Sequence, residues 1–321
     1  MVGLYQSYLM APHVSEALVL VVRYLTDDWV IRQEVCRLIL LAKSMTGEEI
    51  ATQIISVLST EMGIPSDLVV GAMHDRASVN QVAMRTVKVI YHNLLDIGCF
   101  SHTLDRVGEN MKTPILDDFF KAWVGMFTRS PKTRARWRSL TGLPPHSYSA
   151  TRWWSHYEVM AKLMHTFGDV SALIEDEDIL PANASKLQAI LSDSAKTRKL
   201  KMELAATVDC MEPFVKATYN LEGGGFLALE TYQPINALYI AVTSNHMPNV
   251  TAVAKSQANG NSVNERQLLD YAHVCVKPTY DYFKLKSDQD LKPVMKAFKA
   301  ARLFSPSKIN AMRPSPSDVA E

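Results

Sequence analysis

The stretch Leu68-Val-Val-Gly-Ala-Met-His-Asp75-Arg-Ala-Ser-Val-Asn80 decides the fold of this chain. Its first part, residues 68–73, is a short apolar run, which is typical of a buried strand. In residues 77–95 the apolar side chains recur at helical spacing, so a helix is expected after the strand. A strand followed at once by a helix is the repeating unit of an α/β sheet.

The residues before this stretch predict further strands of the same sheet. Residues 17–25 read ALVLVVRYL, a Val- and Leu-rich run of strand length. Residues 29–42 predict a second strand, although their mixed pattern also fits a helix. Thr46-Gly-Glu-Glu49 is a capping box, which marks the start of a helix. An earlier short strand is expected within residues 4–10.

After the helix of residues 77–95, residues 97–100 predict another short strand, and Ser101 is a candidate cap for a following helix. The resulting order is strand, strand, helix, strand, helix, strand. This alternation predicts an α/β protein in which helices pack on a mixed sheet.

The pattern changes after about residue 130, where helical repeats dominate. Helices are expected at residues 154–167, 184–191, 197–219, 225–242, 265–283 and 291–303. The final residues are rich in proline and serine and predict a frayed tail. We therefore expect a core in residues 1–130, a largely helical region in residues 131–304, and a tail in residues 305–321.

Composition limits the functional classes. The chain has 321 residues, 47% of them hydrophobic, and a formal net charge of +1. With so small a net charge, any DNA contact must come from a local basic patch. The four cysteines are widely scattered, which favours a reducing compartment over a disulfide framework. With no apolar run of membrane-spanning length and no charged leader, we expect an intracellular protein without a membrane partner.

Asp75 is the candidate catalytic and metal-binding residue. It lies at the end of a predicted strand, and ligands of α/β sheets gather outside the carboxyl ends of strands. A carboxylate there can bind a divalent cation such as Mg²⁺ or Mn²⁺. The alternative is that Asp75 caps the helix that begins near Ala77.

Two shorter motifs have both a structural and a functional interpretation. Cys99 and His102 have the spacing of half a zinc site, but a structural site needs four ligands, and a buried Cys beside a hydrogen-bonded His is the alternative. Arg152 and Trp153 follow Thr151 and pair a cation with an aromatic ring; packing is the alternative to binding. No phosphate-binding glycine loop or nucleophile elbow occurs, so no small-molecule substrate is expected.

A basic segment, RSPKTRARWR, occupies residues 129–138. Its cations, with Trp137 among them, are candidates for gripping phosphate and stacking on a base. The alternative is a solvated charged helix face. The candidate nucleic-acid-binding residues are Arg129, Lys132, Arg134, Arg136 and Arg138.

Together, the segments from Met73 to Asn80 and from Gly98 to Leu104 resemble hAT-family DNA transposases. In that family an Asp follows the fourth strand of a ribonuclease H-like fold, a Cys-x-x-His motif follows near the fifth strand, and a Thr-Arg-Trp segment precedes a helical insertion. The resemblance spans roughly residues 14 to 300 and implies a DDE mechanism, in which three carboxylates hold two divalent metals. By this resemblance Asp75 matches the second carboxylate.

The sequence departs from the family at the other two carboxylates. The expected first strand contains no Asp or Glu, so it is degenerate at that position; Glu16 lies at the start of the next strand. The third carboxylate, on a late helix, has no match. We therefore expect a transposase-derived, truncated or domesticated protein that is catalytically inactive, needs no cofactor, is nuclear and retains DNA contact or self-association. The alternatives are a protein-interaction scaffold and an active metal-dependent nuclease.

Overall fold

The computed structural model describes residues 2–7, 16–28, 30–41, 43–128, 130–145, 148–149, 153–176, 184–222 and 227–304. The protein is mixed α/β, as predicted, and divides into two compact units. The first comprises Met1–Thr103 with Ser287–Ala297, and the second comprises Leu104–Lys286 with Phe298–Glu321. The chain passes between units inside helix α3 (Phe100–Gly108), ahead of the change in sequence pattern near residue 130. The reason is that α4 (Pro114–Phe127) buries its apolar face in the second unit.

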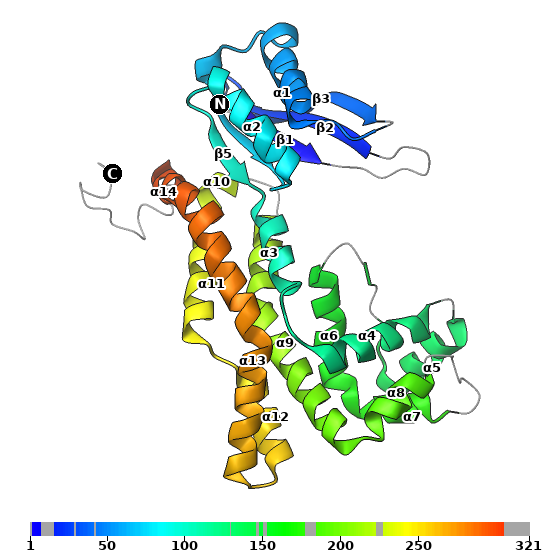
Figure 1. Ribbon diagram of the computed structural model, residues 1–321. Helices are drawn as coiled ribbons and strands as arrows, with labels where there is room; N and C mark the ends of the chain where they lie inside the picture. The colour runs from blue at the N-terminus through cyan, green and yellow to red at the C-terminus, as the bar shows by residue number, and fades with distance from the viewer. Residues whose placement is uncertain are drawn as a thin grey trace. The chain divides into compact units, whose positions relative to one another are not determined.

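The first unit is built on one five-stranded mixed sheet (Figure 1). Its strands are β1 (Val2–Ser7), β2 (Glu16–Leu25), β3 (Ile31–Leu41), β4 (Val69–His74) and β5 (Leu95–Gly98). They lie in the order β3-β2-β1-β4-β5. The first three strands are antiparallel neighbours, whereas β1, β4 and β5 are parallel. The strand interpretation of residues 29–42 is therefore confirmed over the helical alternative.

Two boundaries near β5 differ from the prediction. Helix α2 (Ser78–Ile90) ends before residue 95, because Tyr91 turns out of the helix and is buried. The chain therefore reaches β5 two residues earlier than expected. Helix α3 begins at Phe100, so Ser101 lies inside that helix and is not its cap.

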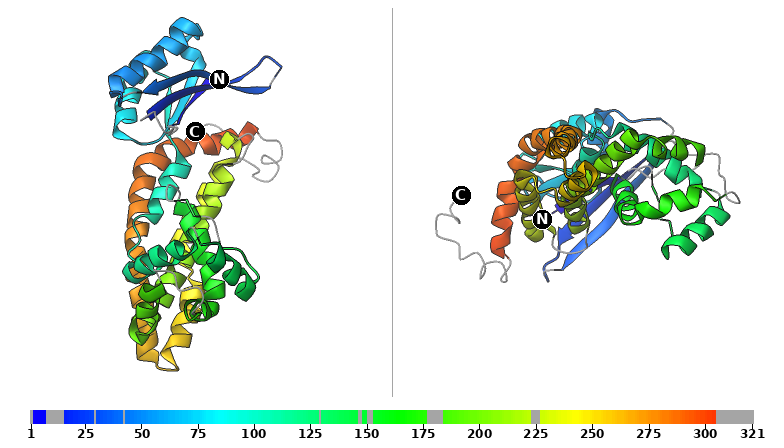
Figure 2. Two further views of the ribbon diagram at one scale, coloured as in Figure 1. Left: turned by 90° about the vertical axis from the view of Figure 1, so that its right-hand side faces the viewer. Right: turned by 90° about the horizontal axis from the view of Figure 1, so that it is seen from below.

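Helices α1 (Gly47–Ile55) and α2 cover one face of the sheet (Figures 1 and 2). The capping box at the start of α1 is confirmed: the Glu49 amide donates to the Thr46 hydroxyl (3.3 Å), and the Thr46 amide donates to the Glu49 carboxylate (2.7 Å). Alternate residues of β2 point to these helices, as the period-two geometry of a strand requires. The core of the unit includes Leu18, Leu20, Val22, Ile50, Ile54, Ala83, Met84 and Val87.

The opposite face of the sheet carries an exposed apolar row on β3. Val35, Leu38 and Leu40 are 66%, 55% and 62% exposed. In the strand register Leu38 is opposite Val19 and Leu40 is opposite Ala17, two residues of β2 that are buried. In the described part of the chain β3 is the last strand at its side of the sheet.

The second unit is helical, as predicted. Its helices after α4 are α5 (Pro131–Thr141), α6 (Trp153–Thr166), α7 (Val170–Ile174), α8 (Ala184–Leu191), α9 (Ser194–Leu221), α10 (Leu227–Glu230), α11 (Tyr232–Ser244), α12 (Pro248–Ala258) and α13 (Ser262–Lys286). The single helix expected in residues 225–242 is interrupted at Thr231, and α4, α5, α7 and α12 were not predicted. The long helix α9 is the centre of this unit and packs against α4, α6, α8, α11, α12 and α13 (Figures 1 and 2). Beyond α13, α14 (Lys292–Ala301) matches the last predicted helix.

Candidate functional site

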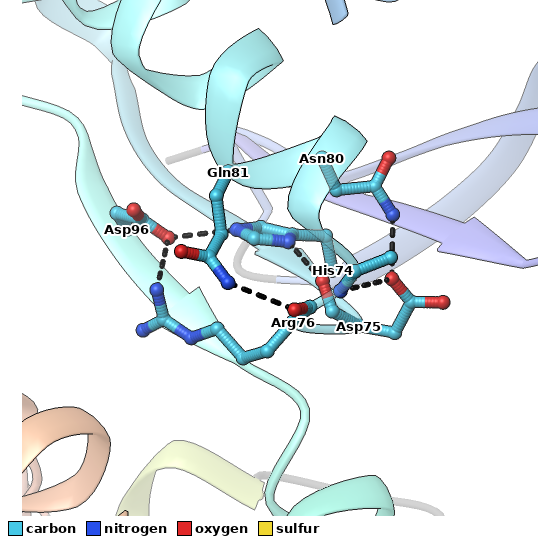
Figure 3. Close-up of polar contacts among 7 residues, drawn as sticks. His74, Asp75, Arg76, Asn80, Gln81 and Asp96 are labelled. Carbon is cyan, nitrogen blue, oxygen red and sulfur yellow. Dashed lines mark hydrogen bonds and ion pairs between the residues drawn. The ribbon is translucent and has the colours of Figure 1, made fainter.

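Asp75 lies where β4 ends and α2 is about to begin. Its Oδ1 accepts hydrogen bonds from the Ala77 amide (3.1 Å) and from the Asn80 side-chain amide (2.6 Å), as Figure 3 shows. Asn80 is fully buried in the first turn of α2. The carboxylate therefore stabilises the strand-to-helix turn by satisfying donors at the start of the helix. The N-cap residue of α2 is Ala77, which has no side-chain cap hydrogen bond, so Asp75 binds the turn that precedes the helix and is not its N-cap.

Asp96, in β5, is a second carboxylate in this region, and sequence reasoning missed it. Its Oδ1 lies 2.8 Å from His74 Nε2 and 3.5 Å from Arg76 Nη1. Burial alone would raise the pKa of Asp96, but the hydrogen bond from His74 and the charge of Arg76 outweigh burial and hold that pKa below its usual range. His74 is only 1% exposed, and its Nδ1 contacts the Asp75 carbonyl oxygen. Asp96 is therefore the ionised partner of two neighbouring side chains.

The two carboxylates do not converge on a common point. Figure 3 shows Asp75 and Asp96 on opposite sides of the His74–Arg76 segment, each bound to its own partners. Within the described ranges, no group of three or more His, Cys, Asp or Glu side chains could hold a metal ion. A pair of divalent cations needs several anionic ligands, and this arrangement does not supply them.

The strand beside β4 adds no carboxylate. β1 reads VGLYQS and pairs in parallel with β4, with Tyr5 opposite Met73. The register brings the last residues of β1, Gln6 and Ser7, toward the end of the sheet at which Asp75 lies. Residues 8–15 lie outside the described residues. Glu16 begins β2, which runs antiparallel to β1, as the sequence indicated.

Three acids of the helical unit are used to bind the start of another helix. The carboxylate of Asp105 accepts from the Trp153 amide (2.6 Å), that of Glu203 accepts from the Leu116 amide (2.7 Å), and that of Asp209 accepts from the Val250 amide (2.9 Å). These acceptors satisfy orphan N–H groups at the N-termini of α6, α4 and α12. Burial is the main cause that raises the pKa of both Glu203 and Asp209. Each of these acids therefore has a structural role.

The Cys-x-x-His motif lies at the start of α3. The Cys99 amide donates to the His74 carbonyl (2.8 Å), and the Cys99 carbonyl accepts from the Thr103 amide (3.0 Å). Cys99 and His102 are both half-buried. The motif therefore joins the end of β4 to the first turn of α3, and the described residues add no second pair of metal ligands to it.

Arg152 lies outside the described residues, whereas Trp153 begins α6. The Trp153 ring packs directly on Gly108, where an added Cβ would lie only 2.1 Å from a ring carbon. Any side chain at position 108 would collide with the indole. Trp153 therefore has a packing position, which was one of the two interpretations of this motif.

Trp137 of the basic segment is a core residue. It is 4% exposed, and its ring meets that of Trp123 edge-on at 4.9 Å between centroids. Phe127 packs edge-on against both rings. An indole enclosed in this way has no free face, so the expectation that Trp137 stacks on a base is wrong.

The four described cations of the basic segment lie on two sides of α5. In α5, Thr133 and Trp137 form the buried stripe. Helical geometry places Lys132 and Arg136 on one flank of that stripe and Arg134 and Arg138 on the other. These four residues, with Arg129 outside the described residues, are the predicted nucleic-acid contacts.

Two of these arginines have partners within the protein. Arg136 Nε lies 2.7 Å from Asp176 Oδ2. Arg134 Nε donates to the Phe127 carbonyl (2.9 Å), which fixes the guanidinium group against α4. Arg138 is exposed one helical turn beyond Arg134. We call Arg134 and Arg138 the basic row.

No protein-family model matches the sequence, and no curated protein matches it. Within the described ranges, every helix is too short or too polar to serve as a membrane span.

Proposed function

We propose that this chain is a transposase-derived protein with a ribonuclease H-like core that does not cleave DNA and that contacts DNA through the basic row. The main support is the position of the two motifs on the sheet. Asp75 directly follows the fourth strand, and Cys99 directly follows the fifth. This is the placement that the resemblance to hAT-family transposases implies. The strand order, with the first strand between an antiparallel and a parallel neighbour, agrees with the proposed core.

The charge at the end of β4 supports the proposed absence of cleavage. A two-metal mechanism requires carboxylates from several elements to meet at one point. At the end of β4, one oxygen of Asp75 binds the start of α2, and Asp96 binds His74 and Arg76. Neither group is arranged to hold a metal pair, so no catalytic step is assigned to this site.

A cleavage assay tests this part of the proposal. Supercoiled plasmid is incubated with the protein and Mg²⁺ or Mn²⁺, with Asp75→Asn as the matched variant. The expected result is no nicking by either protein above a buffer control. Metal-dependent nicking by the parent chain that disappears in the Asp75→Asn variant would show an active nuclease.

Helix geometry supports the proposed contact with DNA. Arg134 and Arg138 are one turn apart on one flank of α5, so both can meet the same phosphate strand. Lys132 is on the other flank and cannot reach that strand at the same time. Binding is therefore expected to be independent of sequence and dependent on salt.

The affinity for a short DNA duplex, measured against salt concentration, tests this contact. The double variant Arg134→Gln/Arg138→Gln should lower the slope of log affinity against log salt by about 2, because each phosphate contact contributes about 0.9. Lys132→Gln should leave the slope unchanged, and so should the control Arg266→Gln, an exposed arginine on α13. A slope that falls equally in all three variants would refute a contact specific to the basic row.

The apolar row on β3 favours a second candidate, an interaction scaffold without DNA binding. Val35, Leu38 and Leu40 expose three large apolar side chains on one face of the sheet, and exposed apolar patches mark protein-interaction sites. Sedimentation velocity at several concentrations tests self-association through this row. A concentration-dependent dimer that Leu38→Glu abolishes, together with no duplex binding at low salt, would favour the scaffold.

A further inference from the structure

The helical unit contains a cavity that none of the predicted motifs explains. It has a volume of about 500 Å³ and lies among α4, α5, α6 and the segment that follows α5. This volume falls within the range of sites that bind small molecules. Trp123 and Trp137, each 4% exposed, line it together with Phe127. The cavity therefore offers a wall of aromatic rings that the core of the unit holds in place.

Two cations also line the cavity, and none of the described residues that line it is acidic. Arg134 comes from α5, and Lys162 comes from α6. In the described part of the chain neither side chain forms an ion pair with a carboxylate; the Nε of Arg134 donates to the Phe127 carbonyl instead. At the end of β4 the opposite holds, because Arg76 has Asp96 as its partner. The positive charge at the cavity is thus available to an anion from outside.

The rim of the cavity is built from a rigid turn. Gly142 has φ +72°, a conformation that favours glycine, and its amide donates to the Arg138 carbonyl (2.8 Å) to end α5. The Leu143 amide then donates to the Thr141 hydroxyl (3.2 Å), and Pro144 and Pro145 restrict the backbone that follows. A turn with this little freedom loses little entropy when a ligand binds.

Tyr148 also lines the cavity. It is 40% exposed, and its ring packs edge-on against Phe120 at 5.2 Å between centroids. Its position is therefore fixed by the core while part of the ring faces solvent. An exposed aromatic ring beside a cavity is a surface on which a flat ligand can stack.

We infer that this cavity binds a nucleotide, with the base stacked on the exposed part of the Tyr148 ring and the phosphate at Arg134 and Lys162. Two cations on one cavity favour a phosphate over a carboxylate, because a phosphate carries more charge and more acceptor oxygens. Aromatic rings accept any base, so little base preference is expected. The inference does not depend on duplex binding by the basic row, although Arg134 belongs to both.

The first test is the binding of adenosine monophosphate. Isothermal calorimetry and the quenching of tryptophan fluorescence measure this binding. The parent chain should bind one nucleotide with a saturable signal. Lys162→Met should weaken binding about tenfold, the loss of one charge-assisted contact, and Tyr148→Ala should weaken it as well. Lys186→Met, which replaces an exposed lysine of α8 that does not line the cavity, is the matched control and should bind like the parent.

Other ligands separate the possible sources of the nucleotide. A short single-stranded oligoadenylate that binds more tightly than adenosine monophosphate, with the same sensitivity to Lys162→Met, assigns the cavity to an unpaired base of a nucleic acid. Equal or weaker binding of the oligonucleotide assigns it to a free nucleotide. An aromatic carboxylate such as 1-naphthoate should compete poorly, and equal competition would overturn the phosphate assignment.

No saturable binding of either nucleotide ligand below about 1 mM would overturn the inference. Equal binding by the parent, Lys162→Met and Tyr148→Ala proteins would do the same. The fold of each variant is checked by its thermal unfolding, since both side chains are partly exposed and their loss should leave the core intact. Failure here is distinct from failure of the duplex proposal, because Arg138 contributes to the duplex contact and does not line the cavity.

Discussion

Charged side chains gather in two very different ways in this protein. At the end of β4, Asp96 is bound by His74 and Arg76, and Asp75 by the backbone and side chain of α2. At the cavity of the helical unit, Arg134 and Lys162 share the lining with aromatic residues, and none of the described lining residues is acidic. Partners within the protein bind the two carboxylates at the end of β4, whereas the positive charge of the two cations at the cavity is not neutralised by a described carboxylate. A carboxylate at the end of a strand is therefore not a functional group by position alone, because hydrogen bonds and ion pairs within the fold can already occupy its oxygens.

The largest expected effect concerns the floor of the cavity. Replacing Trp137 with Ala should reduce the free energy of unfolding by about 3–5 kcal/mol, because a large buried ring is lost from the core. Urea denaturation measures the change. Trp137→Phe, which keeps an aromatic ring, should cost clearly less. A loss below about 1 kcal/mol for Trp137→Ala would show that the indole is not part of a packed core.

The next effect is a dependence of the free energy of unfolding on pH, caused by His156. The ring of His156 packs against Tyr148, which lines the cavity. Burial among Phe120, Tyr148 and Trp153 lowers the pKa of His156 from about 6.5 to about 4. Between these values the unfolded chain binds more protons than the folded one, so the stability conferred by neutral His156 is full above pH 6.5 and is lost toward pH 4. The loss should approach roughly 3 kcal/mol.

Denaturation of the parent and of a His156→Phe variant at several pH values checks this. Phe cannot titrate and fits an aromatic environment, so the variant should lose less stability on acidification. Parallel pH profiles for the two proteins would show that His156 is protonated as easily in the folded state as in the unfolded chain.

Removal of Asp96, at the end of the sheet, should reduce the free energy of unfolding by a smaller but measurable amount. Asp96→Ala leaves the buried His74 without its carboxylate partner and should cost about 1–3 kcal/mol. Because the pKa of Asp96 is held below its usual range, its stabilisation is present above that range and is lost as the pH falls through the lowered value. The matched change Asp75→Ala should cost about 1 kcal/mol, typical of lost hydrogen bonds in a partly buried turn.

Thermal denaturation ranks these two variants. A larger loss for Asp75→Ala than for Asp96→Ala would reverse the roles assigned to the two carboxylates. It would also weaken the argument that Asp75 serves mainly to begin α2.

The smallest effect on stability is expected for Arg138, which lies neither at the end of β4 nor in the lining of the cavity. Arg138→Gln should change the free energy of unfolding by less than about 0.5 kcal/mol. In duplex binding it should still lower the salt slope by about 0.9, the contribution of one phosphate contact. An unchanged slope would remove Arg138 from the proposed contact.

The sequence predicted those elements that local pattern determines. Residues 17–25 form a strand because a short Val- and Leu-rich run fits a buried sheet, and α1 begins at Thr46 because the Thr and Glu side chains satisfy each other's backbone donors. The strand at β4 and the helix after it follow from the same local rules. These features need no knowledge of what lies beside them in space.

The candidate site was harder to predict because it depends on distant neighbours. Asp96 gains its role from His74, 22 positions earlier, once β4 and β5 pair. The arrangement of the basic segment also depends on its structure, because residues two positions apart lie on opposite sides of a helix. Arg134 and Arg136 therefore separate when residues 131–141 form α5. The cavity combines side chains from three helices, which no local spacing reveals.

Among the described strands, β3 pairs on one side only, and this has a consequence for how the protein behaves in concentrated solution. An edge strand of this length can accept a strand from another molecule through its outer backbone groups. Arg32 and Glu34 are exposed on the same strand, and charges there oppose such pairing. Salt screens them, so intermolecular sheet growth, visible as turbidity or fibres, should increase with ionic strength.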